Sequence, residues 1–521
     1  MLIGDIIKFN AKRFKGRLAF KDEGRELTFD QVNKRANAIV HALIDMSVRK
    51  GDRIAILMYN CVEYNELLFA LPKAGFITVT LNYRLVGREL KYIIDNSESS
   101  TLIFGPEFTD TIEEIRPGLE SVKNYIVVDR AGKPRGEALE YEQLIDSHPT
   151  KEIESDVAET DVAYILYTSG TTGFPKGAML THKNIITNLF NQIFEVQPGP
   201  RDRAFNLAPL YHCAGQNIPM AFAFYGCPTM TLSQFDPGLV LETIKAEQPN
   251  VLHLVPAMQN MVLNHPDVGK YDFSCVELMM YGASSMLQSQ LKQSIEIFGC
   301  KYIQFAGQTE SGPLITCLRP EDHAVDGPEH LIRRLGSAGR EVKLTELKIV
   351  DEEGHEVPPH TPGEEIARGD NVMKGYWKMP EATANTIVDG WLHTGDICMK
   401  DEDGYVYYLD RIKDMICRGG ENVYPREIEE VIATHPSIME VAVIGVPDKR
   451  LQEEIMAVIA PKKGAVVPEN EIVTLCEENL ARYKKVRYVE FRQELPKNAS
   501  GKILKRELRK KYENQPLPPK I

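Results

Sequence analysis

The sequence of 521 residues has no excess of positive charge, few cysteines and no long apolar run. Its 61 lysine and arginine residues are outnumbered by 74 aspartate and glutamate residues, giving a formal net charge of -13. This balance opposes general binding to nucleic acid or anionic membranes. The nine cysteines include no CxxC pair, so we expect free thiols in a reducing compartment rather than a disulfide framework or a metal cluster.

No segment has the pattern of a membrane span or a secretory leader. The most apolar stretch, residues 218–232, is interrupted by Pro219 and Pro228 and is too short to cross a bilayer. The first residues mix charge with apolar residues at helical spacing, unlike a signal peptide. We therefore expect a cytoplasmic protein without a transmembrane segment.

The chain is too long for a single hydrophobic core, so at least two domains are expected. β-rich apolar runs alternate with helix-compatible segments from about residue 50 to 165. Short strand candidates continue at 203–207, 251–255, 277–281 and 302–305. This alternation predicts an α/β fold with doubly wound sheets.

The pattern changes after about residue 336, where short strand candidates are separated by turn signals as far as residue 411. We expect a β-rich subdomain over about 336–411. Alternation of helix and strand returns beyond Asp410. The predicted division is an N-terminal domain over 1–411 and a small C-terminal α/β domain over 412–521.

The segment YTSGTTGFPKG, Tyr167–Gly177, has the composition of a phosphate-binding loop. Its three glycines permit close backbone approach, its hydroxyl groups can donate to phosphate oxygens, and Lys176 adds positive charge. The spacing of glycine and lysine differs from that of a Walker loop. The alternative is a polar glycine-rich hairpin that binds nothing.

This segment resembles the signature loop of the adenylate-forming enzymes, a family that includes acyl-CoA synthetases, luciferases and the adenylation domains of peptide synthetases. Further motifs of the family follow in the expected order along most of the chain. The resemblance implies a large N-terminal region with a β-rich subdomain and a small mobile C-terminal domain. It also implies that ATP contacts Thr168, Ser169, Gly170, Thr171, Thr172, Gly173 and Lys176.

QFAGQTE, Gln304–Glu310, resembles the family motif in which a Thr-Glu pair serves the nucleotide. Thr309 would lie near the α-phosphate. Glu310, with Thr172, would bind the Mg²⁺ that bridges the phosphates, because a hard cation prefers oxygen ligands; an exposed acidic turn is the alternative. The family usually has an aromatic residue at Ala306, so the stacking contact with adenine is open. Together with YGASS, residues 281–285, this motif is expected to supply nucleotide contacts from Gly282, Ala283, Ser284, Phe305, Ala306, Gly307 and Gln308.

WLHTGD, ending at Asp396, and DRIKD, beginning at Asp410, resemble the ribose-binding motifs of the family. Asp396 would accept hydrogen bonds from both ribose hydroxyls, and Arg411 would donate to hydroxyl and phosphate; charged hairpin turns are the alternative. By the same resemblance, Lys413 is the hinge of the C-terminal domain. The segment after it implies a path for coenzyme A along Gly419, Gly420 and Glu421.

PKNASGK, residues 496–502, resembles the family segment whose last lysine enters the site for adenylation, a role that falls to Lys502. Its ammonium group would ease repulsion between the carboxylate and the phosphate; a solvated basic helix face is the alternative. PLYHCAG, Pro209–Gly215, resembles the acid-binding entrance, where His212 would lie beside the substrate carboxylate or gate the thiol tunnel. The expected catalytic residues are Lys502, His212, Thr309 and Glu310, and the expected acyl pocket comprises Tyr211, His212, Gly215, Gln216, Tyr281, Gly282, Gly307 and Gly312.

These motifs predict an AMP-forming carboxylic acid:CoA ligase that uses ATP, Mg²⁺ and coenzyme A and proceeds through an acyl-adenylate. No acidic residue lies between Leu207 and Met220, where amino-acid-activating members carry an aspartate. This argues against an amino-acid substrate. The small residues Ala214, Gly215, Ala283, Ala306 and Gly307 leave room for a ring or a longer chain, so we expect a medium- or long-chain fatty, alicyclic or aromatic acid. The alternatives are transfer to a carrier protein, a luciferase-like oxidation, or a non-catalytic nucleotide-binding relative. We expect no nucleic-acid partner, and a homodimer is compatible with the sequence.

Overall fold

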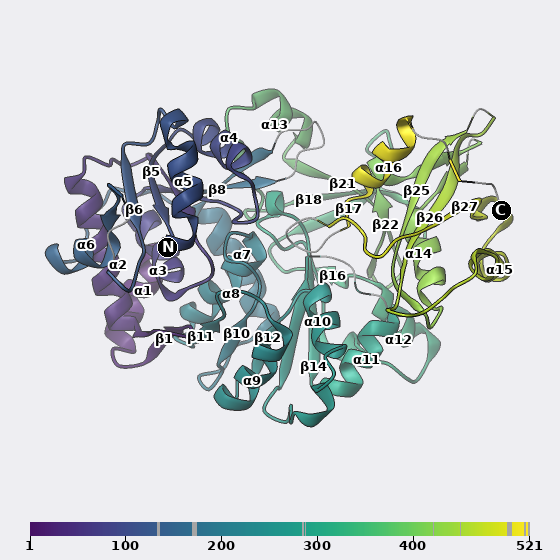
Figure 1. Ribbon diagram of the computed structural model, residues 1–521, viewed down its shortest axis with the longest axis horizontal. Coiled ribbons are helices and arrows are strands. Elements are labelled where there is room, and N and C mark those ends of the chain that lie inside the picture. The colour runs from purple at the N-terminus through teal and green to yellow at the C-terminus, as the bar shows by residue number, and fades with distance from the viewer. Residues whose placement is uncertain are drawn as a thin grey trace.

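The computed structural model describes residues 1–132, 136–168, 175–283, 286, 288–419, 421–448, 450–497, 503–514 and 517–518. The chain forms parallel and mixed sheets surrounded by helices, and the predicted α/β class is confirmed (Figure 1). Among the residues described, no helix has both the length and the apolar character that a membrane crossing requires.

The first sheet contains β3 (Arg53–Leu57), β4 (Ile77–Thr80), β5 (Ser99–Phe104), β6 (Asn124–Val127), β7 (Leu139–Glu140), β8 (Val162–Thr168), β9 (Lys176–Thr181) and β19 (Gly375–Tyr376). Its strand order is β19-β9-β8-β4-β3-β5-β6-β7. Strands β3 to β8 pair in parallel, whereas β9 and β19 are antiparallel additions at one edge. The antiparallel edge places the signature loop between β8 and β9.

The second sheet contains β1 (Leu18–Lys21), β2 (Glu26–Thr28), β10 (Ala204–Asn206), β11 (Thr229–Thr231), β12 (Val251–His253), β13 (Leu278–Gly282), β14 (Lys301–Ala306), β15 (Thr316–Leu318) and β16 (Arg340–Glu341). Its order is β16-β15-β14-β13-β12-β10-β11-β1-β2. The strands from β14 to β1 in this order are parallel, so their carboxyl ends meet at one edge. Four predicted strands are confirmed here as β10, β12, β13 and β14.

The helices of this N-terminal part are α1 (Ile3–Arg13), α2 (Phe29–Asp45), α3 (Val62–Lys73), α4 (Gly87–Ser97), α5 (Thr109–Ile115), α6 (Tyr141–Ser147), α7 (His182–Val196), α8 (Cys213–Phe224), α9 (Pro237–Glu247), α10 (Pro256–Leu263), α11 (Gln288–Phe298), α12 (Glu329–Arg333) and α13 (Pro380–Thr386). Helix α3 contacts both β1 of the second sheet and β8 of the first. All 12 of its residues are buried, as expected of a helix packed on every side.

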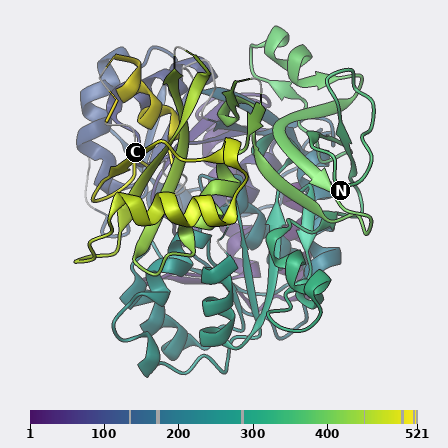
Figure 2. The same cartoon turned by 90° about the vertical axis from the view of Figure 1, so that its right-hand side faces the viewer.

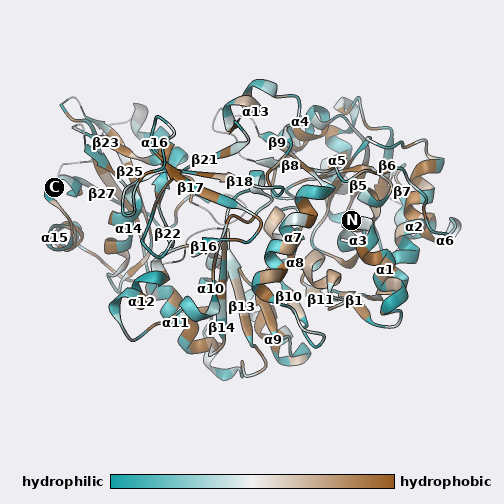
Figure 3. Cartoon of the chain, turned by 180° about the vertical axis from the view of Figure 1, so that it is seen from behind, coloured by the Kyte–Doolittle hydropathy of each residue, from teal (hydrophilic) through white to brown (hydrophobic). Residues whose placement is uncertain are grey.

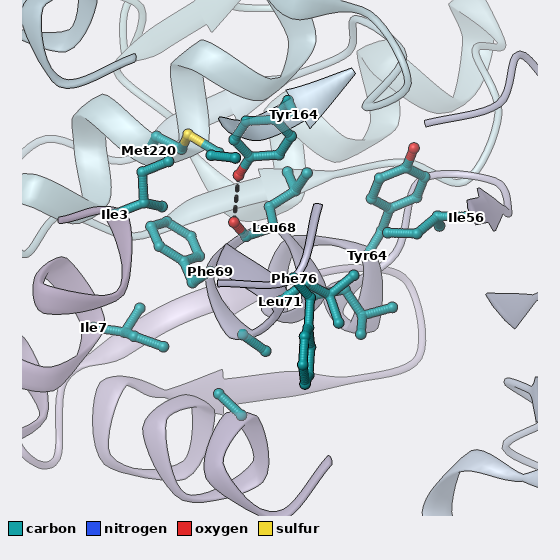
Figure 4. Packing of buried hydrophobic residues seen from close by; sticks show 14 of the residues in the cluster. Ile3, Ile7, Ile56, Tyr64, Leu68, Phe69, Leu71, Phe76, Tyr164 and Met220 are labelled. Carbon is teal, nitrogen blue, oxygen red and sulfur yellow. Dashed lines mark hydrogen bonds between the residues drawn. The ribbon is translucent and has the colours of Figure 1, made fainter. Parts of the chain in front are cut away.

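The core between the two sheets is formed by α1, α3, α7 and α8 together with strands of both sheets. Figure 4 shows part of it, where the hydroxyl of Tyr164 on β8 donates to the carbonyl of Leu68 on α3. Helix α7 begins directly after β9 because Thr181 and Asn184 form a reciprocal cap, with N···O distances of 2.8 and 3.1 Å. This cap fixes the chain immediately after the signature loop.

The third sheet is antiparallel and corresponds to the predicted β-rich subdomain. It contains β17 (Glu346–Val350), β18 (Gly363–Arg368), β20 (Ile387–Val388), β21 (Trp391–Lys400) and β22 (Val406–Arg411). Its burial alternates along β21, which is typical of a strand with one covered face.

The fourth sheet belongs to a separate C-terminal domain, as predicted, on the right in Figure 1 and toward the viewer in Figure 2. It contains β23 (Ile416–Arg418), β24 (Glu421–Val423), β25 (Ile438–Asp448), β26 (Gln452–Pro461) and β27 (Tyr488–Phe491). Alternate residues of β25 pack against α14 (Pro425–Ala433) and α15 (Glu469–Asn479) on one face and α16 (Lys505–Asn514) on the other. Figure 3 shows that the helices around the sheets have both hydrophobic and hydrophilic sides.

Candidate functional site

The signature loop connects two antiparallel strands. Thr168 at the end of β8 lies opposite Lys176 at the start of β9. The two strands that flank the loop therefore form a hairpin, with Thr168 and Lys176 at its two ends. The predicted contacts Ser169, Gly170, Thr171, Thr172 and Gly173 lie outside the described residues.

Glu310 lies where the loop hairpin meets the QFAGQTE segment. Its Oε1 accepts hydrogen bonds from the Thr168 hydroxyl at 3.3 Å and from the Tyr376 hydroxyl at 2.8 Å. The backbone carbonyl of Glu310 also accepts from the amide of Met373 at 2.8 Å. Lys176 places its Nζ 4.9 Å from the centre of the Tyr376 ring. Thr168, Lys176 and Glu310, which are predicted ligands of one nucleotide, are thus brought together.

Asp396 and Arg411 form the second polar centre of the site. They lie directly opposite each other on β21 and β22, and Arg411 Nε is 2.6 Å from Asp396 Oδ1. Burial alone lowers the pKa of Arg411, but the carboxylates of Asp396 and Glu310 outweigh it and raise the pKa. The charge of Glu310 therefore reaches this pair, so the predicted phosphate and ribose residues belong to one site.

The segment between these centres is held by polar contacts. Gln308 Nε2 donates to the Thr394 carbonyl at 3.4 Å, which connects the segment after β14 to β21. The Thr309 hydroxyl is 3.5 Å from Cys213 Sγ, and that sulfur is 3.6 Å from His212 Nδ1. Burial lowers the pKa of His212, so its imidazole is neutral at neutral pH. The predicted acid-binding entrance therefore adjoins the Thr-Glu motif.

Backbone crowding explains two of the predicted glycines. A Cβ atom at Gly215 would lie 2.0 Å from the Pro209 carbonyl oxygen, and one at Gly282 would lie 2.1 Å from the Phe305 carbonyl oxygen. Neither position admits a side chain. The following residue, Ala283, has φ 64°, a left-handed conformation that costs a non-glycine residue about 1–2 kcal/mol. The strand end predicted to line the adenine is thus held in an unusual backbone conformation.

The remaining predicted nucleotide residues differ in exposure. Phe305 is 9% exposed and packs against Ile218 in the core beneath α8, whereas Ala306 is partly exposed. Gly307 has φ 151° and lies between Ala306 and the Thr-Glu pair. Phe305 therefore packs inward rather than presenting its ring at the surface of the site. Ser284 lies outside the described residues.

Several predicted acyl-pocket residues are engaged with neighbours. The Tyr281 hydroxyl is 3.1 Å from His323 Nε2 and 3.3 Å from Gln304 Oε1, and its ring is 2% exposed. The Tyr211 ring makes an edge contact with Tyr83, with centroids 5.1 Å apart. Gln216 Nε2 donates to the Thr80 hydroxyl at 3.3 Å. Gly312 has φ 76° in the turn after Glu310.

The predicted hinge and coenzyme A path lie at the junction with the C-terminal domain. The Lys413 carbonyl accepts from Arg509 Nη1 at 3.4 Å, so α16 contacts the hinge segment. Gly419 has φ 62°, and its amide donates to the Leu451 carbonyl at 2.8 Å. Glu421 begins β24. The predicted residues Gly420 and Lys502 lie outside the described part of the chain.

With this geometry in place, comparison with known proteins identifies the family. Two protein-family models match the chain. The model of the AMP-binding enzyme matches residues 7–377, and the model of the AMP-binding enzyme C-terminal domain matches residues 427–502. The chain belongs to the AMP-binding enzyme family. The predicted resemblance to adenylate-forming enzymes is thereby confirmed.

Three relatives of this AMP-binding enzyme are informative. A feruloyl-CoA synthase from Amycolatopsis sp is 36% identical over 495 residues, 95% of this chain and 96% of the relative. A long-chain-fatty-acid–CoA ligase from Escherichia coli O6:H1 is 32% identical over 536 residues, 97% and 93% of the two chains. The crystal structure of the anthranilate CoA ligase AuaEII in complex with anthranoyl-AMP superimposes with a TM-score of 0.90 at 30% identity, covering 98% and 97%. The predicted class, an AMP-forming acyl-CoA synthetase, is confirmed.

The oxygen ligands in the candidate site of this AMP-binding enzyme fit a cation that is already bound to the nucleotide. The described residues contain no group of three or more histidine, cysteine, aspartate or glutamate ligands around one point. Glu310 instead offers one buried carboxylate beside the Thr168 hydroxyl. Mg²⁺ commonly uses one or two carboxylates together with substrate phosphates and water, so the site fits Mg-ATP as the substrate.

Sequence reasoning missed side chains that support the predicted ones. Tyr376 binds Glu310 from β19, a strand of two residues whose pairing with β9 has no local signal. Glu365 is fully buried on β18, where it accepts from the Tyr408 hydroxyl at 2.8 Å. Burial first, and then the charge of Asp396, raise the pKa of Glu365 to about 8. The doubled glutamate in GEEIARG was the available signal, because a strand with an inward-facing acid is unusual.

Proposed function

We propose that this AMP-binding enzyme activates a medium- or long-chain fatty, alicyclic or aromatic carboxylic acid and transfers the acyl group to coenzyme A. One observation carries the proposal. Glu310 accepts a hydrogen bond from Thr168, and its charge helps to raise the pKa of Arg411, although the three residues come from distant parts of the sequence. The relatives support the range of acids, since one is named for ferulate and another for long-chain fatty acids.

In the first step, a carboxylate oxygen of the acid attacks the α-phosphorus of Mg-ATP, and the bond to the bridging oxygen of pyrophosphate breaks. The loop residues and Lys176 hold the β- and γ-phosphates. Glu310 and Thr172 would hold the Mg²⁺ ion, which would neutralise phosphate charge. Thr309 contacts the reacting centre, and Lys502 would enter it to reduce repulsion between two anions.

The nucleoside is held on the opposite side of the site. Asp396 accepts hydrogen bonds from the ribose hydroxyls, and Arg411 donates to ribose and phosphate while remaining paired with Asp396. The base lies along Gly282–Ser284 and Phe305–Gln308, where Ala306 replaces the usual aromatic surface. A binding pocket without that surface depends more on backbone contacts to the adenine.

In the second step, the C-terminal domain over 412–521 rotates about Lys413 relative to the domain over 1–411. Lys502 withdraws, and the thiol of coenzyme A approaches along Gly419, Gly420 and Glu421. The thiolate attacks the acyl carbonyl, the acyl–phosphate bond breaks, and AMP leaves with the thioester product. His212 borders both the acid and this path, so its neutral imidazole suits an apolar acyl group.

A reaction containing the enzyme, ATP, Mg²⁺, coenzyme A and one acid at a time tests the proposal. Acids to compare are acetate, octanoate, palmitate, benzoate and cyclohexanecarboxylate. We expect one pyrophosphate and one AMP for each acyl-CoA found by mass spectrometry. Replacing Glu310 by glutamine should lower turnover by about 100-fold or more, whereas replacing the exposed Glu321 should not.

Two outcomes contradict the proposal in different ways. Accumulation of acyl-AMP without acyl-CoA would favour transfer to another acceptor. Absence of acid-dependent pyrophosphate release would favour a non-catalytic nucleotide-binding protein. We also propose that the enzyme acts in the cytoplasm. A homodimer is compatible with the sequence, and gel filtration would show whether the enzyme forms one.

A further inference from the structure

Two polar side chains outside the recognised motifs end neighbouring strands of the second sheet. Asn206 is the last residue of β10 and His253 is the last residue of β12, and the two are partners in the parallel register. Ligands of α/β proteins bind beyond the carboxyl ends of parallel strands. Asn206 and His253 therefore lie at the edge of the sheet where a substrate is expected.

Both side chains face α8, which begins at the predicted acid-binding entrance. Along β12, Val251 packs with Ile218 of α8, whereas Leu252 packs in the core on the other side of the sheet. Because side chains alternate along a strand, His253 lies on the α8 side. Gly282 ends the adjacent strand β13, which pairs with β12 at His253 and Met280. The two polar residues thus face the same side of the sheet as α8 and Gly282, whereas Tyr281 of β13 packs on the opposite side.

A chain of hydrogen bonds fixes the orientation of the imidazole. Asn206 Nδ2 donates to the carbonyl of Gly215 in the first turn of α8 at 2.9 Å. The other end of this amide, Oδ1, is then directed at His253 Nδ1, 2.8 Å away. An amide oxygen can only accept, so Nδ1 carries the hydrogen and donates it.

This arrangement leaves Nε2 of His253 as a hydrogen-bond acceptor. Burial lowers the pKa of His253 to about 4, so the ring is neutral and Nε2 carries no hydrogen at neutral pH. The side chain is 6% exposed, and among the described residues only Nδ1 has a hydrogen-bond partner. Nε2 is not among the fully buried polar atoms without a partner, so it keeps some access from outside the protein. It is therefore suited to accept a hydrogen bond from a ligand that takes the place of water.

We propose that His253, held in position by Asn206, recognises a hydrogen-bond donor, a hydroxyl or amino group, on the organic acid. The inference rests on the proposed function, because it assigns a substrate class to the same site. The acid would be a hydroxylated or amino-substituted aromatic or aliphatic carboxylic acid. His253 is then a specificity-determining residue that takes no part in the chemical step.

The expected selectivity between acids depends on whether the acid donates a hydrogen bond to His253 Nε2. An acid with a hydroxyl or amino group at the right position donates to Nε2, whereas the unsubstituted acid leaves Nε2 buried and unpaired. A methoxy group fills similar space but cannot donate. Sites that hydrogen-bond a substrate group reject analogues that lack it more strongly than apolar pockets reject small changes in size.

The test measures kcat/KM for acyl-CoA formation with matched acids. The set contains the positional isomers of hydroxybenzoate, aminobenzoate and hydroxycinnamate, ω-hydroxy fatty acids, and the corresponding unsubstituted and methoxy acids. We expect at least one donor-bearing acid to exceed both matched controls by about tenfold or more. His253→Leu should remove this preference while retaining activity with the unsubstituted acid.

Two further variants separate recognition from structure. His253→Gln keeps an acceptor and should retain part of the preference, while Asn206→Leu releases the imidazole and should weaken it. Equal kcat/KM for all matched acids in the wild-type enzyme would overturn the inference, as would an equal loss for all acids in His253→Leu. Turnover of unsubstituted acids in the same assays shows that the proposed function holds even when the inference fails.

Discussion

At the scale of single residues, the buried Glu365 is the clearest departure from an ordinary sheet. It lies fully buried on β18, accepts a hydrogen bond from Tyr408, and neighbours the Asp396–Arg411 pair. A carboxyl group in this position is more easily kept neutral than charged, because ionisation would add a second negative charge beside Asp396. The Asp396–Arg411 pair therefore has a protonated acid beside it at neutral pH.

This protonation predicts a pH-dependent stability. The pKa of Glu365 is raised to about 8 in the folded protein and is about 4.3 in the unfolded chain. Between these values the folded state binds more protons than the unfolded state, so its free energy of unfolding decreases as pH rises. Glu365→Gln removes this contribution of Glu365 to the pH dependence of the free energy of unfolding. The melting temperature of the variant relative to wild type should therefore increase from pH 5 to pH 8, by an amount corresponding to a few kcal/mol.

A thermal-denaturation series at half-unit pH steps would measure this effect. Glu346→Gln is the matched control, because Glu346 is exposed on β17 of the same sheet. Parallel pH curves for wild type and Glu365→Gln would contradict the assignment of a neutral carboxyl group.

At the scale of elements, α16 connects the C-terminal domain to the residues on either side of Lys413, the predicted hinge. Lys505 lies 2.8 Å from Glu429 on α14 and 3.4 Å from Asp410 on β22. Arg509 of the same helix lies 2.7 Å from Asp414. One basic helix face therefore contacts acidic groups on both sides of Lys413, and this face stabilises the observed orientation of the domains.

Replacing Lys505 by glutamine should shift the orientation of the C-terminal domain. Without the cation, Asp410 and Glu429 repel across the junction, and a contact of this kind contributes about 1 kcal/mol or somewhat more. The ratio of acyl-AMP formation to thioester formation should change roughly two- to tenfold. Rapid-quench assays of each half-reaction would measure it.

Lys511→Gln is the control for this helix, since Lys511 contacts Glu490 within the C-terminal domain at 2.5 Å. It should leave the ratio unchanged. A uniform loss of both half-reactions in Lys505→Gln would indicate a damaged domain instead of a shifted orientation.

The elements also show what local sequence could and could not predict. The strands β10, β12, β13 and β14 were found because each is a short apolar run bounded by turn signals. The joining of β1 to β11, and of β19 to β9, was not predicted, because such pairings join residues more than 190 positions apart and no local periodicity encodes them. Tyr376 was missed for the same reason.

The residues of the candidate site were predicted mainly through motif resemblance. The physical properties of these residues alone would not have identified them. Thr168, Glu310, Asp396 and Arg411 are each one polar residue in a turn-rich segment, which is typical of solvated loops. Their common location depends on the packing of three sheets. His253 was absent from the predicted pocket because a single buried histidine has no characteristic spacing.

At the scale of the whole molecule, the two steps are proposed to need different domain orientations. Replacing Lys502 by alanine should therefore reduce acyl-AMP formation by about 100-fold or more while leaving thioester formation from supplied acyl-AMP within a few-fold of wild type. Measuring the two half-reactions separately would show this difference.

Lys497→Ala is the matched control, because Lys497 belongs to the same segment, residues 496–502, but forms an ion pair with Glu440. Both of its half-reactions should stay near wild type. If Lys502→Ala lost both half-reactions equally, a mechanism with two domain orientations would lose its main support.

The contact between Cys213 and Thr309 has a chemical consequence for an enzyme that makes reactive acyl donors. Burial raises the pKa of the Cys213 thiol to about 11, so roughly one molecule in ten thousand carries a thiolate there at pH 7. An acyl-adenylate formed beside Thr309 would meet a neutral, unreactive sulfur. Burial of the Cys213 thiol therefore disfavours its acylation relative to that of an external thiol.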